Sequence, residues 1–217
     1  MSSENSYNKI NYTFEFQGKS KSFQLPDKFE NRSTVADRYF ESTDYIQVND
    51  SRVANLANSI AKTIDSDSKT LRALFDYVEK IPNEPIITLT DAVSALEQNM
   101  ASCYGKSRLL VALCRNLGYA SRVKGGMILN TTNTRQSHAW AEVFINDQWV
   151  PFDTVNSHFA YLPANYLELY ENDEFLLTHS KGIDFDYNYE IKQEINIPII
   201  DASSSEISTL ITISQLK

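Results

Sequence analysis

The first half of the chain carries apolar residues at helical spacing. One stripe follows Ser51 and consists of Val53, Leu56, Ala57, Ile60 and Ile64. A second stripe consists of Leu71, Leu74, Phe75 and Val78. Both predict amphipathic helices, the second of which ends before Pro82. The polar run Asp65-Ser66-Asp67 separates them and supplies a cap. A shorter third helix is predicted from Thr90 to Gln98, with Thr90 or Asp91 near its N-cap.

A fourth predicted helix, from Cys103 to Leu117, has clear ends. Ser102 suits the N-cap, because its hydroxyl can accept a backbone N–H of the first turn. Gly118 suits the left-handed position just past the last turn. Leucines at 109, 110, 113 and 117 form a buried stripe between these ends. Cys114 lies in the same apolar run, so we expect it to be a small core residue.

Beyond Gly118 the pattern changes to that of strands. Strands are predicted at 121–124, 127–129, 138–145 and 148–152. Helices followed by such a run of strands are typical of an α+β fold, with helices packed on an antiparallel sheet. Phe159 to Thr178 is predicted to be loop and short helix. Two further strands, Tyr187–Ile200 and Thr209–Ile213, are predicted on either side of the polar break Asp201–Glu206.

The segment before the first helix is predicted to be an appendage. Ile10–Leu25 alternates apolar and polar residues around Gln17-Gly18-Lys19, which predicts an N-terminal β-hairpin. Pro26–Asp50 is mixed and polar, as in a loop with short turns. The chain therefore divides into a hairpin and linker (1–50), a core (51–182) and a β-rich C-terminal extension (183–217).

The composition fits one compact domain and argues against several kinds of partner. The chain has 217 residues, 42% of them hydrophobic, and a formal net charge of −8. The acidic balance opposes binding to nucleic acid. No apolar run approaches the roughly 18 residues of a membrane helix, so we expect no membrane insertion by this chain.

The first residues carry a weaker expectation about location. Met1 to Asn8 is polar and lacks the apolar core of a signal peptide. Taken literally, the chain is cytoplasmic. As a trimmed domain of an anchored protein, it would be extracytoplasmic.

Three residues of the predicted core have the chemistry of a nucleophilic site. Cys103 lies at the start of a helix, where unpaired N–H groups favour an anion, and the thiolate is the reactive form of cysteine. His138 could exchange its proton, and Asp153 could hold the imidazole in place. His158 and His179 lack such a context, and we expect them in loops or at the surface.

The turn after the His138 strand decides whether His138 and Asp153 meet. If Asn146-Asp147 is a two-residue turn, Ile145 pairs with Gln148. Asp153 then becomes the diagonal neighbour of His138 on one face, about 7–8 Å away between Cα atoms. A three-residue turn would move Asp153 to the other face. The hypothesis therefore requires the two-residue register or a bulge that restores it.

These residues resemble the transglutaminase-like core, a branch of the papain-like cysteine-peptidase fold. The resemblance rests on Ser102-Cys103-Tyr104 with its helix, His138-Ala139-Trp140-Ala141-Glu142, Trp149 and Asp153. It covers roughly Val53 to Asp153. It implies a bacterial-type enzyme without metal or other cofactor, in which Cys103 is the nucleophile, His138 the base and Asp153 the orienting carboxylate. The implied reaction is acyl transfer from an amide of a protein or peptide to water or to an amine.

Further residues are expected around this site. Trp140 and Tyr104 are expected in the cleft. An oxyanion hole is expected from the Cys103 backbone N–H and a side-chain amide, either Gln98 or Asn99.

Three departures from the family pattern support an alternative function. Ala101 stands where the family often has Gly, and Thr154 stands where it often has Pro or Ala. Gly105 weakens the first helical turn. The alternative is an inactive binding or sensory module, the soluble part of a larger membrane-anchored protein with other domains as partners.

Two other motifs are excluded. Gly105-Lys106-Ser107 resembles the end of a phosphate loop, but the first glycine of that motif would fall at Met100. Two cysteines eleven positions apart and three scattered histidines lack metal-ligand spacing. On a helix the two cysteines lie about 16 Å apart, too far for a disulfide between them.

Overall fold

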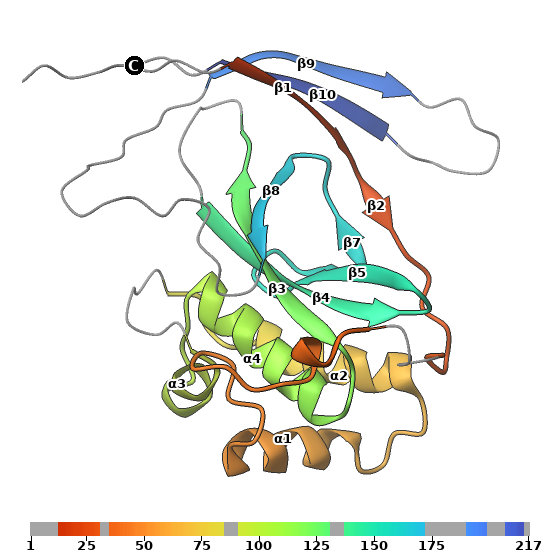
Figure 1. The fold of residues 1–217 in the computed structure, drawn as a ribbon, viewed down its shortest axis with the longest axis vertical. Coiled ribbons are helices and arrows are strands. Elements are labelled where there is room, and N and C mark those ends of the chain that lie inside the picture. The colour runs from red at the N-terminus through yellow and green to blue at the C-terminus, as the bar shows by residue number, and fades with distance from the viewer. Residues whose placement is uncertain are drawn as a thin grey trace, which may run out of the picture.

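The computed structural model describes residues 13–30, 35–84, 91–130, 137–171, 190–198 and 207–214. In these ranges, four helices pack beside a five-stranded antiparallel sheet, and a three-stranded sheet lies at the other end of the molecule (Figure 1). The fold is thus the expected α+β arrangement. No helix in the described part of the chain has the length and apolar character needed to cross a membrane.

Each helix begins at a side chain that accepts a backbone N–H. The helices are α1 (Ser51–Ala61), α2 (Asp67–Glu79), α3 (Ala92–Gln98) and α4 (Cys103–Asn116). Their N-caps are Asp50, Ser66, Asp91 and Ser102. Such caps satisfy donors that the helix itself leaves unpaired. The caps expected at Asp91 and Ser102 are confirmed.

Helix α4 is the centre of the core. It contacts the other three helices on one side and strands β3 and β4 on the other (Figure 1). Its last turn closes at Gly118, whose φ of 77° suits glycine. The N–H of Gly118 donates to the Arg115 carbonyl and that of Tyr119 to the Cys114 carbonyl, both at 2.9 Å. Cys114 is fully buried, as expected.

The five-stranded sheet has the order β6-β5-β4-β3-β8. Its strands are β3 (Ser121–Ile128), β4 (Ser137–Ile145), β5 (Gln148–Asp153), β6 (His158–Phe159) and β8 (Tyr166–Glu171). Asn146 and Asp147 have φ values of 46° and 63°, as a type I′ turn requires, and Ile145 pairs with Gln148. The two-residue register is therefore confirmed.

The expected N-terminal β-hairpin is wrong. β1 (Thr13–Lys19) pairs with β10 (Ile207–Ser214), which also pairs with β9 (Glu190–Pro198). β2 (Lys21–Ser22) pairs instead with β7 (Tyr161–Leu162). Gly18 lies within β1 and not in a turn. Alternation predicts a strand but does not select its partner, and here the partner lies near the other end of the sequence.

The loop and short helix expected from Phe159 to Thr178 are also wrong over the described residues. This stretch carries β7 and β8, and β8 completes the sheet beside β3 (Figure 1). The rest of the stretch, from 172 to 178, lies outside the described residues, as do His179 and the polar break Asp201–Glu206. The linker before α1 contains one 3-10 turn, η1 (Asp37–Tyr39).

Gly126 allows β3 and β8 to approach. A Cβ atom at this position would overlap the carbonyl oxygen of Leu167 in β8. Gly126→Ala should therefore lower the free energy of unfolding by about 1–3 kcal/mol, the usual cost of overpacking. Urea unfolding measures this loss. Gln148→Ala, at an exposed strand position, is the control and should change it by less than about 0.5 kcal/mol. Equal values for the two variants would contradict the close approach.

Candidate active site

Cys103 is the first residue of α4. The two residues before it, Ala101 and Ser102, are held in place by hydrogen bonds. Ser102 caps the helix by accepting the Gly105 N–H at 3.3 Å. Ala101 is fully buried. Its N–H donates to the Pro82 carbonyl at 3.1 Å, and its carbonyl accepts the Glu84 N–H at 2.9 Å. The thiol therefore projects from a backbone fixed by hydrogen bonds, despite the alanine at 101.

Lys106 ties the same region together one turn further along α4. Its ammonium is buried and donates to the carbonyls of Glu79 at 3.0 Å and Ile81 at 2.9 Å. Burial lowers the pKa of Lys106. The sequence pattern drew attention to Lys106 only within the excluded phosphate-loop motif. In the structure it fastens the end of α2 to the start of α4.

His138 and Asp153 lie together, as the strand register requires. His138 is the second residue of β4 and Asp153 is the last residue of β5, and both side chains are buried. The His138 Nε2 atom lies 2.7 Å from the Asp153 Oδ2 atom. An interaction with the nearby Cys103 thiol also raises the pKa of His138. Since Nε2 faces Asp153, Nδ1 is the ring nitrogen left for the thiol.

Asp153 is the most heavily hydrogen-bonded side chain of the site. Its Oδ1 atom accepts the backbone N–H groups of Val155 at 2.9 Å and Asn156 at 3.2 Å. Its Oδ2 atom accepts His138, the Tyr166 hydroxyl at 2.7 Å and the Asn156 side-chain amide at 2.9 Å. Burial alone would raise the pKa of Asp153, but these donors and the charge of His138 hold it well below its usual range. The carboxylate therefore stays ionised.

This carboxylate changes the protonation of His138. Burial lowers the pKa of His138, whereas the interactions with Asp153 and Cys103 raise it, and the net result is a pKa of about 9. The imidazole is consequently charged at neutral pH. A charged imidazole between a thiol and a carboxylate can stabilise a thiolate and later donate its proton.

The raised pKa of His138 predicts a specific dependence of stability on pH. Because the folded value, about 9, exceeds the unfolded value of about 6.5, the contribution is complete below pH 6.5. It is lost as the pH rises through 9. On the order of 3 kcal/mol should disappear over this window. Denaturant unfolding from pH 6 to 9.5 measures the loss, which should be absent in His138→Asn. A wild-type slope equal to that of the variant would contradict the ion pair.

Aromatic rings enclose His138. The rings of His138 and Trp140 stack with centroids 6.5 Å apart, and Tyr166 meets both rings edge-on. Trp140, expected in the cleft, is fully buried, so it supports the imidazole from within. Tyr104, the other residue expected in the cleft, is half-buried beside Cys103, and the Arg108 guanidinium lies 5.3 Å from its ring centroid.

The two oxyanion candidates lie at the end of α3. Gln98 is its last residue, and Asn99 follows in the left-handed conformation with φ of 47°. Both are exposed to solvent. The assignment of either amide to an oxyanion hole stays a prediction.

Asn156 and the role of Tyr166 were not predicted from the sequence. Asp153 and Asn156 form a turn in which the aspartate accepts backbone N–H groups two and three residues on. The Asp-x-x-Asn spacing is a signal that could have indicated this turn. Nothing in the sequence indicated that Tyr166 reaches Asp153, because its segment was expected to be loop and short helix. His158, expected at the surface or in a loop, is half-buried in β6, and its Nδ1 atom lies 3.3 Å from the Tyr166 hydroxyl.

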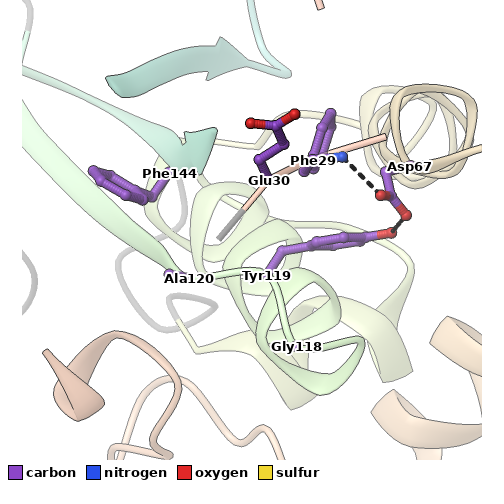
Figure 2. Close-up of a pocket in the computed structure, with 7 residues that line it drawn as sticks. All are labelled: Phe29, Glu30, Asp67, Gly118, Tyr119, Ala120 and Phe144. Atoms are coloured by element: carbon purple, nitrogen blue, oxygen red, sulfur yellow. Dashed lines mark hydrogen bonds between the residues drawn. The ribbon is translucent and has the colours of Figure 1, made fainter. Parts of the chain in front are cut away.

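A pocket lies just past the C-terminal end of α4, whereas Cys103 is at the start of that helix. Figure 2 shows the residues that line this pocket. Phe29, Glu30, Asp67, Gly118, Tyr119, Ala120 and Phe144 line it. Asp67 accepts the Phe29 N–H and the Tyr119 hydroxyl, both at 2.9 Å, so its carboxylate is engaged in holding the walls together. The volume of about 40 Å³ suits a few water molecules. We interpret it as a crevice where the N-terminal segment packs on α2. In the described ranges, no group of three His, Cys, Asp or Glu side chains is placed to hold a metal ion.

Comparisons with known proteins agree with this fold. Residues 54–154 match the transglutaminase-like superfamily. A candidate cysteine protease from Cytophaga hutchinsonii superposes with a TM-score of 0.57 at 16% identity, over 82% of this chain and 64% of that one. The periplasmic domain of TgpA from Pseudomonas aeruginosa superposes with a TM-score of 0.44 at 19% identity, over 58% of this chain and 49% of that one.

The coverage and the sequence identity of these matches determine which conclusions they support. No curated protein sequence matches the chain. The chain spans about 64% of the length of the Cytophaga hutchinsonii protein, and at 16% identity the likeness shows the fold alone. The matched segment contains Cys103, His138 and Asp153. Residues 54–154 therefore form a core of the transglutaminase-like superfamily.

Proposed function

We propose that the chain is a cysteine-dependent amide hydrolase or acyltransferase. Cys103 is the nucleophile, His138 the acid and base, and Asp153 the orienting carboxylate. The observation that carries this proposal is the 2.7 Å contact between His138 Nε2 and Asp153 Oδ2. The Cys103 thiol is near enough to the same imidazole to raise its pKa. Charge supports it as well, because a buried ionised carboxylate favours a protonated imidazole beside the thiol.

The reaction would proceed in two steps. The Cys103 thiolate attacks the amide carbonyl, and a tetrahedral oxyanion forms. His138 then donates its proton from Nδ1 to the leaving amine, the C–N bond breaks, and a thioester remains on Cys103. In the second step neutral His138 takes a proton from water or from an amine. That nucleophile displaces the thiolate and releases an acid or a new amide.

The oxyanion needs donors near the start of α4. The Cys103 backbone N–H has no carbonyl partner within the helix, since the first four N–H groups of any helix lack one. It can therefore point at the developing negative charge. We propose the Gln98 or Asn99 amide as the second donor, because Gln98 ends α3 and Asn99 begins the short connection to α4.

We propose proteins or peptides as substrates. The formal net charge of −8 disfavours nucleic acid, and a Cys-His-Asp triad acts on acyl groups such as the amide carbonyls of a peptide chain. Which acceptor follows the acyl-enzyme decides between hydrolysis and cross-linking. Other domains of a longer protein would be additional partners.

One experiment separates the two reactions from the inactive alternative. Unfolded casein is incubated with the chain, with and without a fluorescent primary amine, and both peptide release and amine incorporation are measured. The Cys103→Ser variant is the matched control. Hydrolysis predicts peptide release alone, and acyl transfer predicts amine incorporation, each lost in the variant. If neither product exceeds that of the variant across several protein substrates, the chain is instead a binding module.

A further inference from the structure

The hydrogen bonds of the site continue past Asp153 to a strand outside the matched family core. Tyr166 lies on β8, beyond residue 154, where the family match ends. Its hydroxyl lies 2.7 Å from the Asp153 Oδ2 atom, the same oxygen that faces His138. Tyr166 and His138 therefore compete for one carboxylate oxygen.

The direction of these hydrogen bonds follows from the donors available. Ionised Asp153 can only accept, so the Tyr166 hydroxyl donates its proton to it. The Tyr166 oxygen then accepts the Asn156 side-chain N–H at 2.9 Å. It also lies 3.3 Å from His158 Nδ1, which must carry a hydrogen to complete the contact. Because Asn156 and His158 both donate to the Tyr166 oxygen, the hydroxyl hydrogen of Tyr166 is left to donate to Asp153.

We propose that Tyr166 is a positioning residue of the triad, which shares the Asp153 Oδ2 atom with His138 and limits how strongly the carboxylate holds the imidazolium. This inference rests on the proposed function, since it assigns Tyr166 a role through Asp153 and His138. Tyr166 does not need to touch the substrate. It acts on how readily His138 gives up its proton.

The sheet holds Tyr166 rigidly in this place. Its side chain is 6% exposed, and its ring packs edge-on against those of His138 and Trp140, with centroids 5.7 Å and 5.4 Å away. At the other end of β8, the Glu171 carboxylate pairs with Arg122 at 2.7 Å and Lys124 at 3.0 Å on β3. These contacts keep the Tyr166 hydroxyl within hydrogen-bond distance of Asp153.

The same geometry gives the sign of the effect. A hydroxyl donating to the carboxylate is stabilised most when His138 is neutral, because Asp153 then has no cation beside it. The hydroxyl therefore favours neutral His138. Without it, Asp153 holds the imidazolium more tightly, and proton donation to the leaving amine becomes slower.

The test is a histidine titration that does not depend on turnover. The chain has three histidines, so ¹⁵N-histidine labelling with His138→Asn for assignment follows the His138 ring directly. In Tyr166→Phe we expect its midpoint to rise by on the order of 0.5 pH unit or more. Where turnover is measurable, kcat should fall by up to about threefold, the change in acid strength that 0.5 pH unit represents. KM should stay unchanged.

Tyr161→Phe is the matched control. Tyr161 is 37% exposed and packs edge-on against His158 with ring centroids 5.3 Å apart, so it should alter neither the His138 midpoint nor kcat. If Tyr166→Phe does not fold, Asn156→Ser is used in its place, because it removes the other side-chain donor to Oδ2 and should shift the midpoint the same way.

An unchanged or lower His138 midpoint in a folded Tyr166→Phe variant would overturn the inference. A wild-type protein without turnover would count against the proposed function alone, because the titration would still report on Tyr166. The two failures are therefore distinguishable.

Discussion

Replacement of Cys103 by serine should lower turnover by about 10⁴-fold or more while leaving the fold intact. Serine has nearly the size of cysteine and can keep the contact with His138. An alcohol, however, loses its proton far less readily than a thiol, and the imidazolium of this site is arranged to accompany a thiolate. The measurement is kcat/KM for wild type and variant on the substrate found in the casein assay.

Cys114→Ala is the control for this experiment. Burial raises the pKa of the Cys114 thiol, and its position near the far end of α4 removes it from the site. Its loss should cost a little stability and no turnover. Retained activity in Cys103→Ser, or lost activity in Cys114→Ala, would contradict the assignment of the nucleophile.

Asp153→Asn should have the second-largest effect, with turnover reduced by about 10³–10⁴-fold. The amide cannot carry the charge that keeps His138 protonated, so the pKa of His138 should fall from about 9 toward its usual value. Imidazole orientation should be lost as well, because His138 could then bond to the amide in more than one tautomer.

The same substitution should destabilise the fold by about 2–4 kcal/mol. Every group facing the Asp153 oxygens is a donor: three donate to Oδ2 and two to Oδ1. Whichever way an asparagine turns, its NH₂ group would face N–H or O–H groups. The donors that now face either Oδ1 or Oδ2 of Asp153 must therefore lose their acceptor.

Asp44→Asn supplies the matched control for Asp153→Asn. Asp44 is an exposed loop residue, so the same loss of one charge should change stability by less than about 0.5 kcal/mol. Urea unfolding at pH 7 compares the two variants with wild type. A loss in Asp153→Asn no larger than that of Asp44→Asn would contradict the hydrogen-bond pattern at Asp153.

The part of the site that sequence could predict is the part set by local chemistry. Ser102 and Gly118 bound α4 on either side, and their capping preferences are enough to place Cys103 at a helix start. Asn146 and Asp147 tolerate positive φ, and that property alone favours the register that joins His138 to Asp153. Both inferences depend on residues close together in the chain.

The parts that sequence did not predict depend on pairing between distant segments. Nothing near Thr13–Lys19 indicates that its partner is a strand near the other end of the chain. Likewise, β8 is short, and its pairing with β3 depends on Gly125 and Gly126, which leave room for Tyr170 and for the Leu167 carbonyl. Tyr166 reaches Asp153 only through this pairing, so its role could not be inferred from its neighbours.

The most direct test of the proposed Cys103-His138-Asp153 triad is the rate of Cys103 alkylation as a function of pH. Iodoacetamide labelling of Cys103 is followed by mass spectrometry from pH 5 to 10, in wild type and in His138→Ala. We predict fast labelling of the wild type already at pH 6, because the imidazolium stabilises the thiolate, and a large loss of this labelling in the variant. If Cys103 instead reacts as an ordinary thiol, with a rate that rises only near about pH 8.5 and does not depend on His138, the triad is contradicted.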